Sequence, residues 1–190
     1  ILSIGVRPNI GLAQDAGLEM GKKGIRVNEF MQTSDPDIYA GGDCVESRCI
    51  ISGEFVWQPM GSAANRQGRV IADHIAGVNS RFSGVERTAI ARVFDWTVGK
   101  TGLSAEEAVN AGFNPASLVI TAPDIPGFMP GSAPLFIQII SDAQTRRILG
   151  AKVSGPGKAD KRLDVLATAI KGNLTLDDLA DVDFAYAPPF

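Results

Sequence analysis

The chain has 190 residues, of which 45% are hydrophobic and 21% are charged, and its formal net charge is -3 at pH 7. This balance fits a globular protein and argues against a nucleic-acid or membrane surface, because the sequence has neither a basic excess nor an apolar run of about 18 residues. Two cysteines, Cys44 and Cys49, cannot form a disulfide framework, and no His or Cys cluster has the spacing of a zinc site. We expect a cytoplasmic protein without a bound metal.

The chain begins with an apolar segment. Ile1 to Gly5 has the pattern of a buried β-strand already under way, without an initiator Met or a preceding turn. Pro8 then biases Arg7 toward extended backbone. We therefore expect the sequence to be a fragment of a longer protein.

The segment Thr33 to Asp43, T-S-D-P-D-I-Y-A-G-G-D, is the most informative part of the chain. A turn signal is followed by a predicted strand at Ile38–Ala40, by two glycines and by Asp43 at the carboxyl end of that strand. Ligands of open α/β sheets collect at such ends, where a carboxylate accepts hydrogen bonds from a ribose or polyol hydroxyl. The alternative is a buried strand that ends in a turn, with Asp43 as a local cap.

A helix is predicted next. Pro59 and Ser62 mark its beginning, and apolar residues continue at helical spacing to Gly77. The amino terminus of a helix carries partial positive charge and unpaired N–H groups, so it stabilises negative charge. The alternative is an amphipathic surface helix. His74 is the single histidine of the chain, and we expect it on the surface of this helix without a catalytic role.

The pattern changes beyond Gly84, and the later residues predict an α+β unit of roughly a hundred residues with its own core. The expected elements are a strand at Ala89–Val98, a capping box at Ser104–Glu107 that opens a helix to Gly112, a strand at Pro115–Ala122, a hairpin of Leu135–Ile140 and Arg147–Val153, a helix with Leu163, Leu166, Ala167 and Ile170 on one face, and a short helix capped by Thr175.

Two motifs carry a family resemblance. T-S-D-P-D-I-Y-A-G-G-D resembles the second FAD-binding motif of the pyridine nucleotide-disulfide oxidoreductases, and I-G-V-R-P-N resembles the segment where their NAD(P)H-binding domain returns the chain to the FAD domain. The resemblance implies that Asp43 holds the ribityl chain of FAD while the backbone near Gly42 faces the pyrophosphate. It also implies that the backbone around Met60, Gly61 and Ala63 lies at the pyrimidine edge of the flavin.

Three further motifs resemble the branch of coenzyme A-disulfide reductases, NADH oxidases and NADH peroxidases. They are F-D-W-T-V-G-K-T-G-L, K-R-L-D-V-L-A-T-A-I and the final A-Y-A-P-P-F. The resemblance implies a homodimer in which the tail reaches the other subunit's flavin site, where Tyr186 acts as a hydrogen-bond donor or acid beside the catalytic sulfur. It also implies FAD and NAD(P)H as cofactors and a small thiol, disulfide, persulfide, peroxide or oxygen as substrate.

Two departures from related patterns limit the prediction. Phe128–Gly131, F-M-P-G, stands where coenzyme A-disulfide reductases carry Y-Y-P-G, so a second tyrosine hydroxyl is missing and the substrate stays open. Cys44 and Cys49 have the C-x4-C spacing of the glutathione reductase redox pair, but they follow Asp43 instead of lying near the first FAD-binding unit. We expect both thiols to be structural or incidental.

The predicted fold class is α+β, with a remnant of an FAD-binding α/β domain followed by an α+β dimerisation domain with an antiparallel sheet. Residues 1–10 are assigned to the end of the NAD(P)H-binding domain, 11–84 to the FAD-binding domain and 85–190 to the dimerisation domain. The predicted function is the carboxyl-terminal part of an FAD-dependent NAD(P)H oxidoreductase, inactive by itself because it lacks a G-x-G-x-x-G loop and the catalytic cysteine. Two alternatives are a non-catalytic interaction module and a rubredoxin- or ferredoxin-reductase-like electron carrier.

Overall fold

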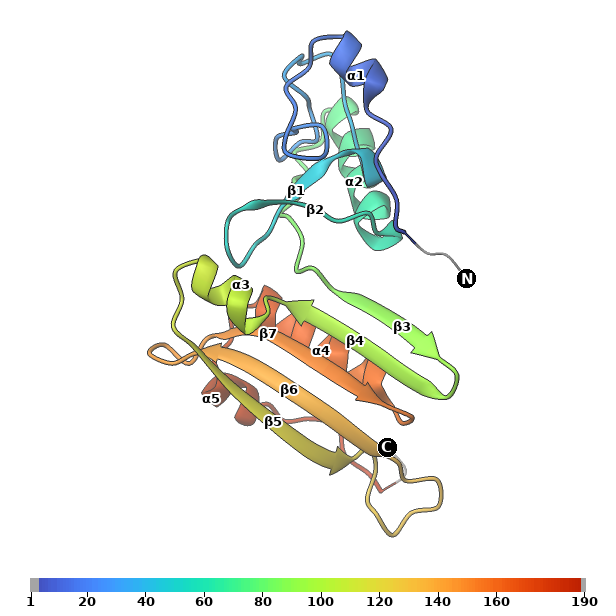
Figure 1. The fold of residues 1–190 in the computed structure, drawn as a ribbon, viewed down its shortest axis with the longest axis vertical. Coiled ribbons are helices and arrows are strands. Elements are labelled where there is room, and N and C mark those ends of the chain that lie inside the picture. The colour runs from blue at the N-terminus through green and yellow to red at the C-terminus, as the bar shows by residue number, and fades with distance from the viewer. Residues whose placement is uncertain (1–3, 189–190) are drawn as a thin grey trace. The chain divides into compact units, whose positions relative to one another are not determined.

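The computed structural model describes residues 4–188 of the chain, which divides into two compact units, Ile1–Val85 and Glu86–Phe190 (Figure 1). The elements of the first unit are α1 (Gly11–Asp15), the 3-10 helix η1 (Gly42–Cys44), β1 (Glu46–Arg48), β2 (Phe55–Trp57) and α2 (Gly61–Ile75). Those of the second are β3 (Ala89–Val93), β4 (Trp96–Gly102), α3 (Ala105–Asn110), β5 (Pro115–Pro123), β6 (Pro134–Asp142), β7 (Ile148–Gly155), α4 (Ala159–Lys171) and α5 (Leu176–Ala180).

The core of the first unit joins α1, the long loops and α2. Its buried side chains are Ala13, Ile25, Met31, Val45 and Val70. β1, which begins directly after Val45 of this cluster, pairs antiparallel with β2. The backbone N–H of Ile25 donates to the carbonyl oxygen of Cys44 at 2.8 Å, so the loop that contains Ile25 is tied to the last residue of η1.

One strand expected in this unit, at Ile38–Ala40, is absent. Ile38–Ala40 contains only one isolated bridge, between Tyr39 and Gln32, because no neighbouring segment among the described residues offers these residues a continuous ladder of hydrogen bonds. The strand predicted at the start of the chain falls partly on residues 1–3, which lie outside the described residues. Ile4 is exposed and is not part of a strand.

The helix predicted from Pro59 and Ser62 is confirmed as α2. It buries Ala63, Gln67 and Val70, which recur at helical spacing on one stripe. The helix ends just before Gly77, which has a φ of +79°, a left-handed conformation that glycine adopts at low cost. This end agrees with the predicted one.

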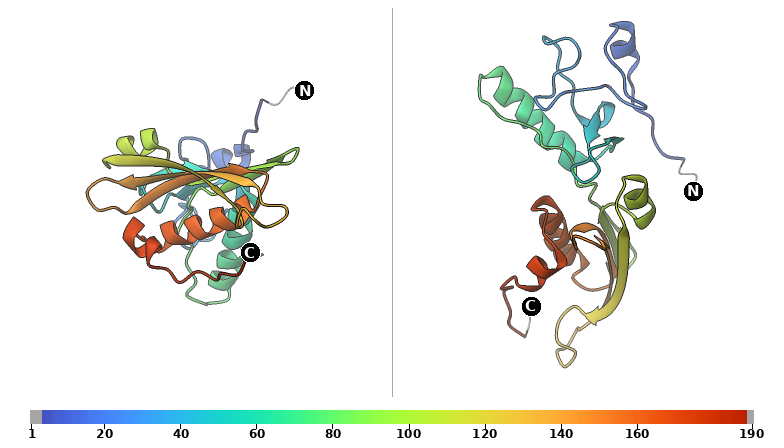
Figure 2. Two further views of the ribbon diagram at one scale, coloured as in Figure 1. Left: turned by 90° about the horizontal axis from the view of Figure 1, so that it is seen from below. Right: turned by 90° about the vertical axis from the view of Figure 1, so that its left-hand side faces the viewer.

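A five-stranded antiparallel sheet in the order β3-β4-β7-β6-β5 forms the centre of the second unit (Figure 2). The predicted hairpin is confirmed as β6 and β7. The carboxylate of Asp142 stabilises its turn by accepting the backbone N–H groups of Gln144 at 3.0 Å and Thr145 at 2.8 Å. The expected α+β class with an antiparallel sheet is therefore correct.

The single strand predicted at Ala89–Val98 is wrong, because the segment is a hairpin. β3 and β4 pair antiparallel, with Val93 opposite Trp96. Phe94 in the turn has a φ of +54°, a left-handed conformation that a bulky residue seldom adopts. The turn, Phe94-Asp95, carries neither glycine nor proline, the two strongest turn signals, so the break between the two strands was missed.

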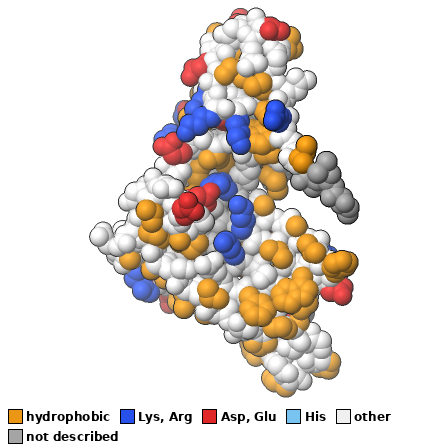
Figure 3. Space-filling model, viewed as in Figure 1, with side chains coloured by type: hydrophobic (Ala, Val, Ile, Leu, Met, Phe, Trp, Pro, Cys, Tyr) orange, Lys and Arg blue, Asp and Glu red, His pale blue; other side chains and the backbone are white. Residues whose placement is uncertain are grey.

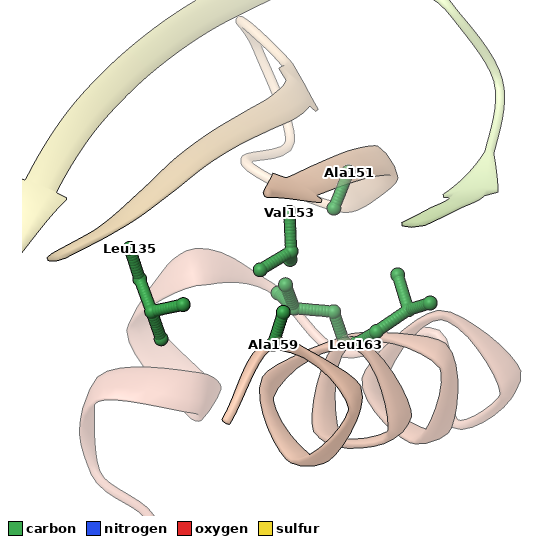
Figure 4. Packing of buried hydrophobic residues seen from close by; sticks show 6 residues of the cluster. Leu135, Ala151, Val153, Ala159 and Leu163 are labelled. Atoms are coloured by element: carbon green, nitrogen blue, oxygen red, sulfur yellow. The ribbon is translucent and has the colours of Figure 1, made fainter. Parts of the chain in front are cut away.

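Helix α4 covers one face of the sheet (Figure 2). Figure 4 shows Leu163 and Ala159 of α4 facing Ala151 and Val153 of β7, with Leu135 of β6 beside them. Burying one leucine side chain such as Leu163 contributes about 1.5–3 kcal/mol, so this contact holds α4 on the sheet.

Two short helices of the second unit begin with the caps that the sequence predicts. Ser104 and Glu107 form both hydrogen bonds of a capping box at the start of α3, and Thr175 and Asp178 do so at the start of α5. Each pair satisfies two backbone N–H groups that the helix itself leaves unpaired.

The opposite face of the sheet carries exposed apolar side chains. Cross-strand pairing places Val98, Ser154 and Phe136 in one row on the side away from α4, because side chains alternate along a strand. Val98 is 48% exposed and Phe136 is 39% exposed, and the ring of Phe136 stacks on Trp96 at 5.9 Å between centroids. Figure 3 shows hydrophobic side chains gathered on this face. We call it the open sheet face.

Candidate functional site

The candidate site in the first unit is built on the turn that contains Gly41, Gly42 and Asp43. Gly41 is extended, whereas Gly42 has a φ of +82°, which favours glycine. A Cβ atom on Gly41 would lie 3.2 Å from Cδ1 of Ile71 in α2. The two glycines therefore let the backbone of η1 pass close to α2 and stay open toward a ligand.

Asp43 lies in η1 and not at the end of a strand, which corrects the reasoning behind its prediction. Its side chain is exposed, and no donor among the described residues contacts its carboxylate. Its backbone carbonyl oxygen accepts a hydrogen bond from Nε1 of Trp57 at 2.8 Å. The turn is thus anchored through its main chain, and the carboxylate is left available as a hydrogen-bond acceptor.

The first turn of α2 lies beside this turn. A Cβ atom on Gly42 would be 3.7 Å from Cβ of Ala64. Met60 is the N-cap residue, but its side chain makes no capping hydrogen bond, and the first turn contains no acidic residue. The N–H groups of Ala63 and Ala64 donate to the carbonyl oxygen of Met60. The N–H groups of Gly61 and of the following residue are left at the tip of the helix, where partial positive charge suits an anionic or electron-rich ligand.

Gln67 connects the two elements, and the sequence reasoning missed it. Its Oε1 accepts the N–H of Gly42 at 2.7 Å, and its Nε2 donates to Oγ of Ser47 at 2.8 Å. A signal was available, because Gln67 occupies a position on the same stripe as Ala63 and Val70. A polar residue on an apolar stripe requires buried partners.

Neither cysteine forms a disulfide. Cys49 is fully buried, and the thiol of Cys44 donates to the carbonyl oxygen of Gly41 at 3.3 Å. These surroundings favour the structural interpretation. His74 is only partly exposed, which corrects the expectation of a plain surface residue, because its ring packs between Phe30 and Tyr39.

Tyr186 belongs to the second unit, where it is 76% exposed. It lines a groove of about 660 Å³ whose walls include Ile137 of β6 and Val165 of α4, with Lys161 and Arg162 among its charged residues. Pro189 and Phe190, the end of the predicted tail motif, lie outside the described residues. The exposed phenol of Tyr186 can donate a hydrogen bond to an anionic or sulfur group.

The loop that carries Phe128 is held by the carboxylate of Asp124. Phe128 itself is 77% exposed. The Asp124 carboxylate accepts the N–H groups of Ile125 at 3.0 Å, Ala133 at 2.8 Å and Lys158 at 3.2 Å. Burial raises the pKa of Asp124, but these hydrogen bonds to the charged form outweigh burial and hold the pKa below its ordinary value.

The roles predicted for Gly42, Asp43, Met60, Gly61, Ala63 and Tyr186 stay predictions. In the part of the chain that the structure describes, no group of three His, Cys, Asp or Glu side chains is arranged to hold a metal ion. Within the same residues, no helix is both long and apolar enough to span a membrane.

Two family models match the chain. The model described as "Pyridine nucleotide-disulphide oxidoreductase" matches residues 1–68, and the one described as "Pyridine nucleotide-disulphide oxidoreductase, dimerisation domain" matches residues 88–190.

Several known proteins are similar to this chain over all or nearly all of its length. The "NAD(P)H coenzyme A polysulfide/persulfide reductase" of Pyrococcus horikoshii is 39% identical over 100% of this chain and 43% of its own length. The "NADH oxidase" of Methanocaldococcus jannaschii is 39% identical over 100% of this chain and 42% of its own length. The solved structure of an NAD-dependent persulfide reductase from A. fulgidus has a TM-score of 0.95 and 43% identity over 98% of this chain and 35% of its own. The chain therefore spans less than half the length of these relatives.

Proposed function

Because this chain belongs to the pyridine nucleotide-disulphide oxidoreductase family, we propose that it is the carboxyl-terminal part of an FAD-dependent enzyme that oxidises NAD(P)H. The observation that carries the proposal is the exposed, unpaired carboxylate of Asp43 on a two-glycine turn beside the uncapped first turn of α2. The residues present fit one half of a flavin site. A location in the cytoplasm stays a prediction.

Each part of this half-site has a distinct task toward FAD. Asp43 would accept hydrogen bonds from ribityl hydroxyl groups. The backbone at Gly42 would allow the pyrophosphate to approach closely, since no side chain blocks it. The N–H groups at Gly61 and the partial positive charge of α2 would stabilise negative charge at the pyrimidine edge. When bound, FAD would supply the hydride and electron transfer between NAD(P)H and the substrate.

The substrate class that we propose is a small persulfide or polysulfide. Two of the similar proteins carry persulfide in their names, at 39% and 43% identity. The loop at Phe128 lacks the second tyrosine hydroxyl of coenzyme A-disulfide reductases, so Tyr186 would be the remaining phenol that holds or donates a proton at the reacting sulfur. Oxygen is the second candidate, because the M. jannaschii relative is named an NADH oxidase.

We also propose a homodimer formed through the second unit. A match to a dimerisation-domain model over residues 88–190 supports this. The open sheet face, with Trp96, Val98 and Phe136 partly exposed, offers an apolar surface that a second copy would cover. Obligate homodimer interfaces are rich in apolar residues and bury upwards of about 2,000 Å².

The test uses the full-length protein that contains this chain. It should purify with FAD and oxidise NAD(P)H faster with a persulfide or polysulfide than with oxygen. Tyr186→Phe should lower the rate of sulfur reduction and leave FAD content unchanged. Preference for oxygen would reject the sulfur substrate, unchanged turnover in Tyr186→Phe would remove Tyr186 from the reaction, and absence of FAD would favour a non-catalytic interaction module.

A further inference from the structure

Gln67 is a buried polar side chain on a face of α2 that otherwise packs against the core. It is 1% exposed. Because a backbone N–H can only donate, the hydrogen bond from Gly42 requires that the amide oxygen of Gln67 face the turn. The amide nitrogen then faces Ser47, whose hydroxyl accepts. The side chain therefore has one orientation, and it joins η1, α2 and β1.

The turn that Gln67 contacts is also held through its carbonyl groups, because Cys44 accepts the N–H of Ile25 at 2.8 Å and Gly42 accepts the N–H of Val45 at 3.3 Å. The N–H of Gly42, in contrast, has Gln67 as its partner among the described residues. Gly41 and Gly42 have no side chains, and glycine has access to more backbone conformations than any other residue. Trp57 binds the carbonyl oxygen of Asp43 from a partly exposed position, and the thiol of Cys44 is a weak donor. The hydrogen bond from Gly42 to Gln67 is the shortest of these contacts, at 2.7 Å, and the side chain that accepts it is almost fully buried.

We propose that Gln67 is the positioning residue of the flavin site. By binding the N–H of Gly42, Gln67 fixes the position of the Asp43 carboxylate relative to the first turn of α2. The ribityl chain of FAD can then bind Asp43 while its pyrimidine edge binds the first turn of α2. This inference rests on the flavin site proposed above. It has a specific consequence: Gln67 acts on FAD through Asp43, so removing both side chains should cost little more affinity than removing Asp43 alone.

The test is a double-mutant cycle on the full-length apoprotein, titrated with FAD and followed by flavin fluorescence. Gln67→Met keeps an unbranched side chain of similar size and removes both hydrogen bonds, so the dissociation constant for FAD should rise about tenfold. In an Asp43→Ala background the same change should raise it less than about twofold. Gln14→Met, the same substitution at an exposed position of the same unit, should leave the dissociation constant unchanged.

A second variant, Ser47→Ala, keeps the proposal testable if Gln67→Met does not fold. Ser47→Ala leaves Gln67 in place but removes the acceptor of its amide nitrogen, so it should raise the dissociation constant about two- to fivefold. If Gln67→Met does not fold, this variant decides the matter in the same cycle with Asp43→Ala.

The outcomes separate the two proposals. If Asp43→Ala leaves FAD affinity unchanged, the flavin site is rejected, and the role of Gln67 with it. If Asp43→Ala weakens binding but Gln67→Met and Ser47→Ala do not, the flavin site stands and Gln67 is only a structural residue. Gln67 is also only a structural residue if the double variant raises the dissociation constant for FAD by the product of the two single effects, because the two side chains then act independently. A weakening by Gln67→Met that disappears in the Asp43→Ala background supports the positioning role.

Discussion

The phenol oxygen of Tyr39 lies 2.8 Å from Nδ1 of His74, and this hydrogen bond ties the loop before η1 to α2. The ring of His74 also packs on Phe30, with 4.6 Å between centroids, and the guanidinium of Arg81 lies 5.0 Å from the centroid of the Phe30 ring. These side chains come from three separate stretches of sequence. They hold the chain that leads to Asp43 against α2.

Removing this hydroxyl should destabilise the first unit. Tyr39→Phe should lower its free energy of unfolding by about 0.5–1.5 kcal/mol, because the hydrogen bond to His74 is lost. The chain has two tryptophans, so the fluorescence of Trp57 in a Trp96→Phe background reports urea unfolding of this unit alone. Tyr186→Phe is the matched control and should not change the midpoint. Equal midpoints for Tyr39→Phe and its parent would show that the hydrogen bond contributes nothing.

Asp43→Ala should reduce FAD retention in the full-length protein. The loss of charge-assisted hydrogen bonds should cost about 1–3 kcal/mol, which corresponds to a dissociation constant roughly 5- to 150-fold higher. The measurement is the ratio of FAD to protein after dialysis. Asp15→Ala, an exposed aspartate of the same unit, should retain FAD like the parent. Retention by Asp43→Ala equal to that of the parent would reject the role of this carboxylate.

The 190-residue chain by itself should purify without colour. It carries the Asp43 half of the proposed site but no G-x-G-x-x-G loop to bind phosphates, so its contacts with FAD are too few for stable binding. The measurement is the visible absorbance of the purified protein. A flavin band in stoichiometric amount would contradict the expectation.

The open sheet face should carry the dimer contact. Phe136→Asp places a charge where an apolar side chain would be buried between two copies, so it should convert a dimer into a monomer at micromolar concentration. Sedimentation velocity of the 190-residue chain measures this. Val109→Asp, at an exposed apolar position on α3, should leave the dimer intact. A monomeric parent would reject the dimer, and a dimeric Phe136→Asp variant would place the contact elsewhere.

Acid should weaken the second unit partly through Asp124. The pKa of this carboxyl is held below its ordinary value in the folded protein, so its contribution to stability is complete above the unfolded pKa of about 4 and is lost as the pH falls through the folded pKa. Urea unfolding followed by Trp96 fluorescence in a Trp57→Phe background should therefore show stability falling between about pH 5 and pH 2.

The variant Asp124→Asn should show a smaller fall over the same range, since it no longer binds a proton there. Part of the fall should persist, because the pKa values of Asp142, Asp177 and Asp178 in the same unit are lowered as well. Asp164→Asn, at an exposed position on α4, should behave like the parent. Identical pH profiles for Asp124→Asn and the parent would remove Asp124 from the acid response.

Local sequence signals were sufficient for much of the fold. The capping box at Ser104 and the turn at Asp142 depend on residues within a few positions of each other, so their hydrogen bonds can be predicted from the local sequence. The apolar stripe of α4 correctly predicted that Leu163, Leu166 and Ile170 are buried, but it placed Ala167 among them where the structure buries Ala169. The strand expected at Ile38–Ala40 failed because a strand requires a partner, and a local pattern does not specify one.

In the candidate site, too, some residues could be predicted from the local sequence and others only from the tertiary structure. Asp43 and the two glycines before it were identified from their order along the chain, because a turn that must approach a ligand needs those residue types. The partner of that turn, Gln67, lies 25 residues away from Gly42, and only the packing of α2 against η1 brings them together. The sequence by itself determined the residues that offer chemistry to a ligand, whereas the tertiary structure decided which buried side chain holds them in place, because that contact depends on distance in space and not on spacing in the chain.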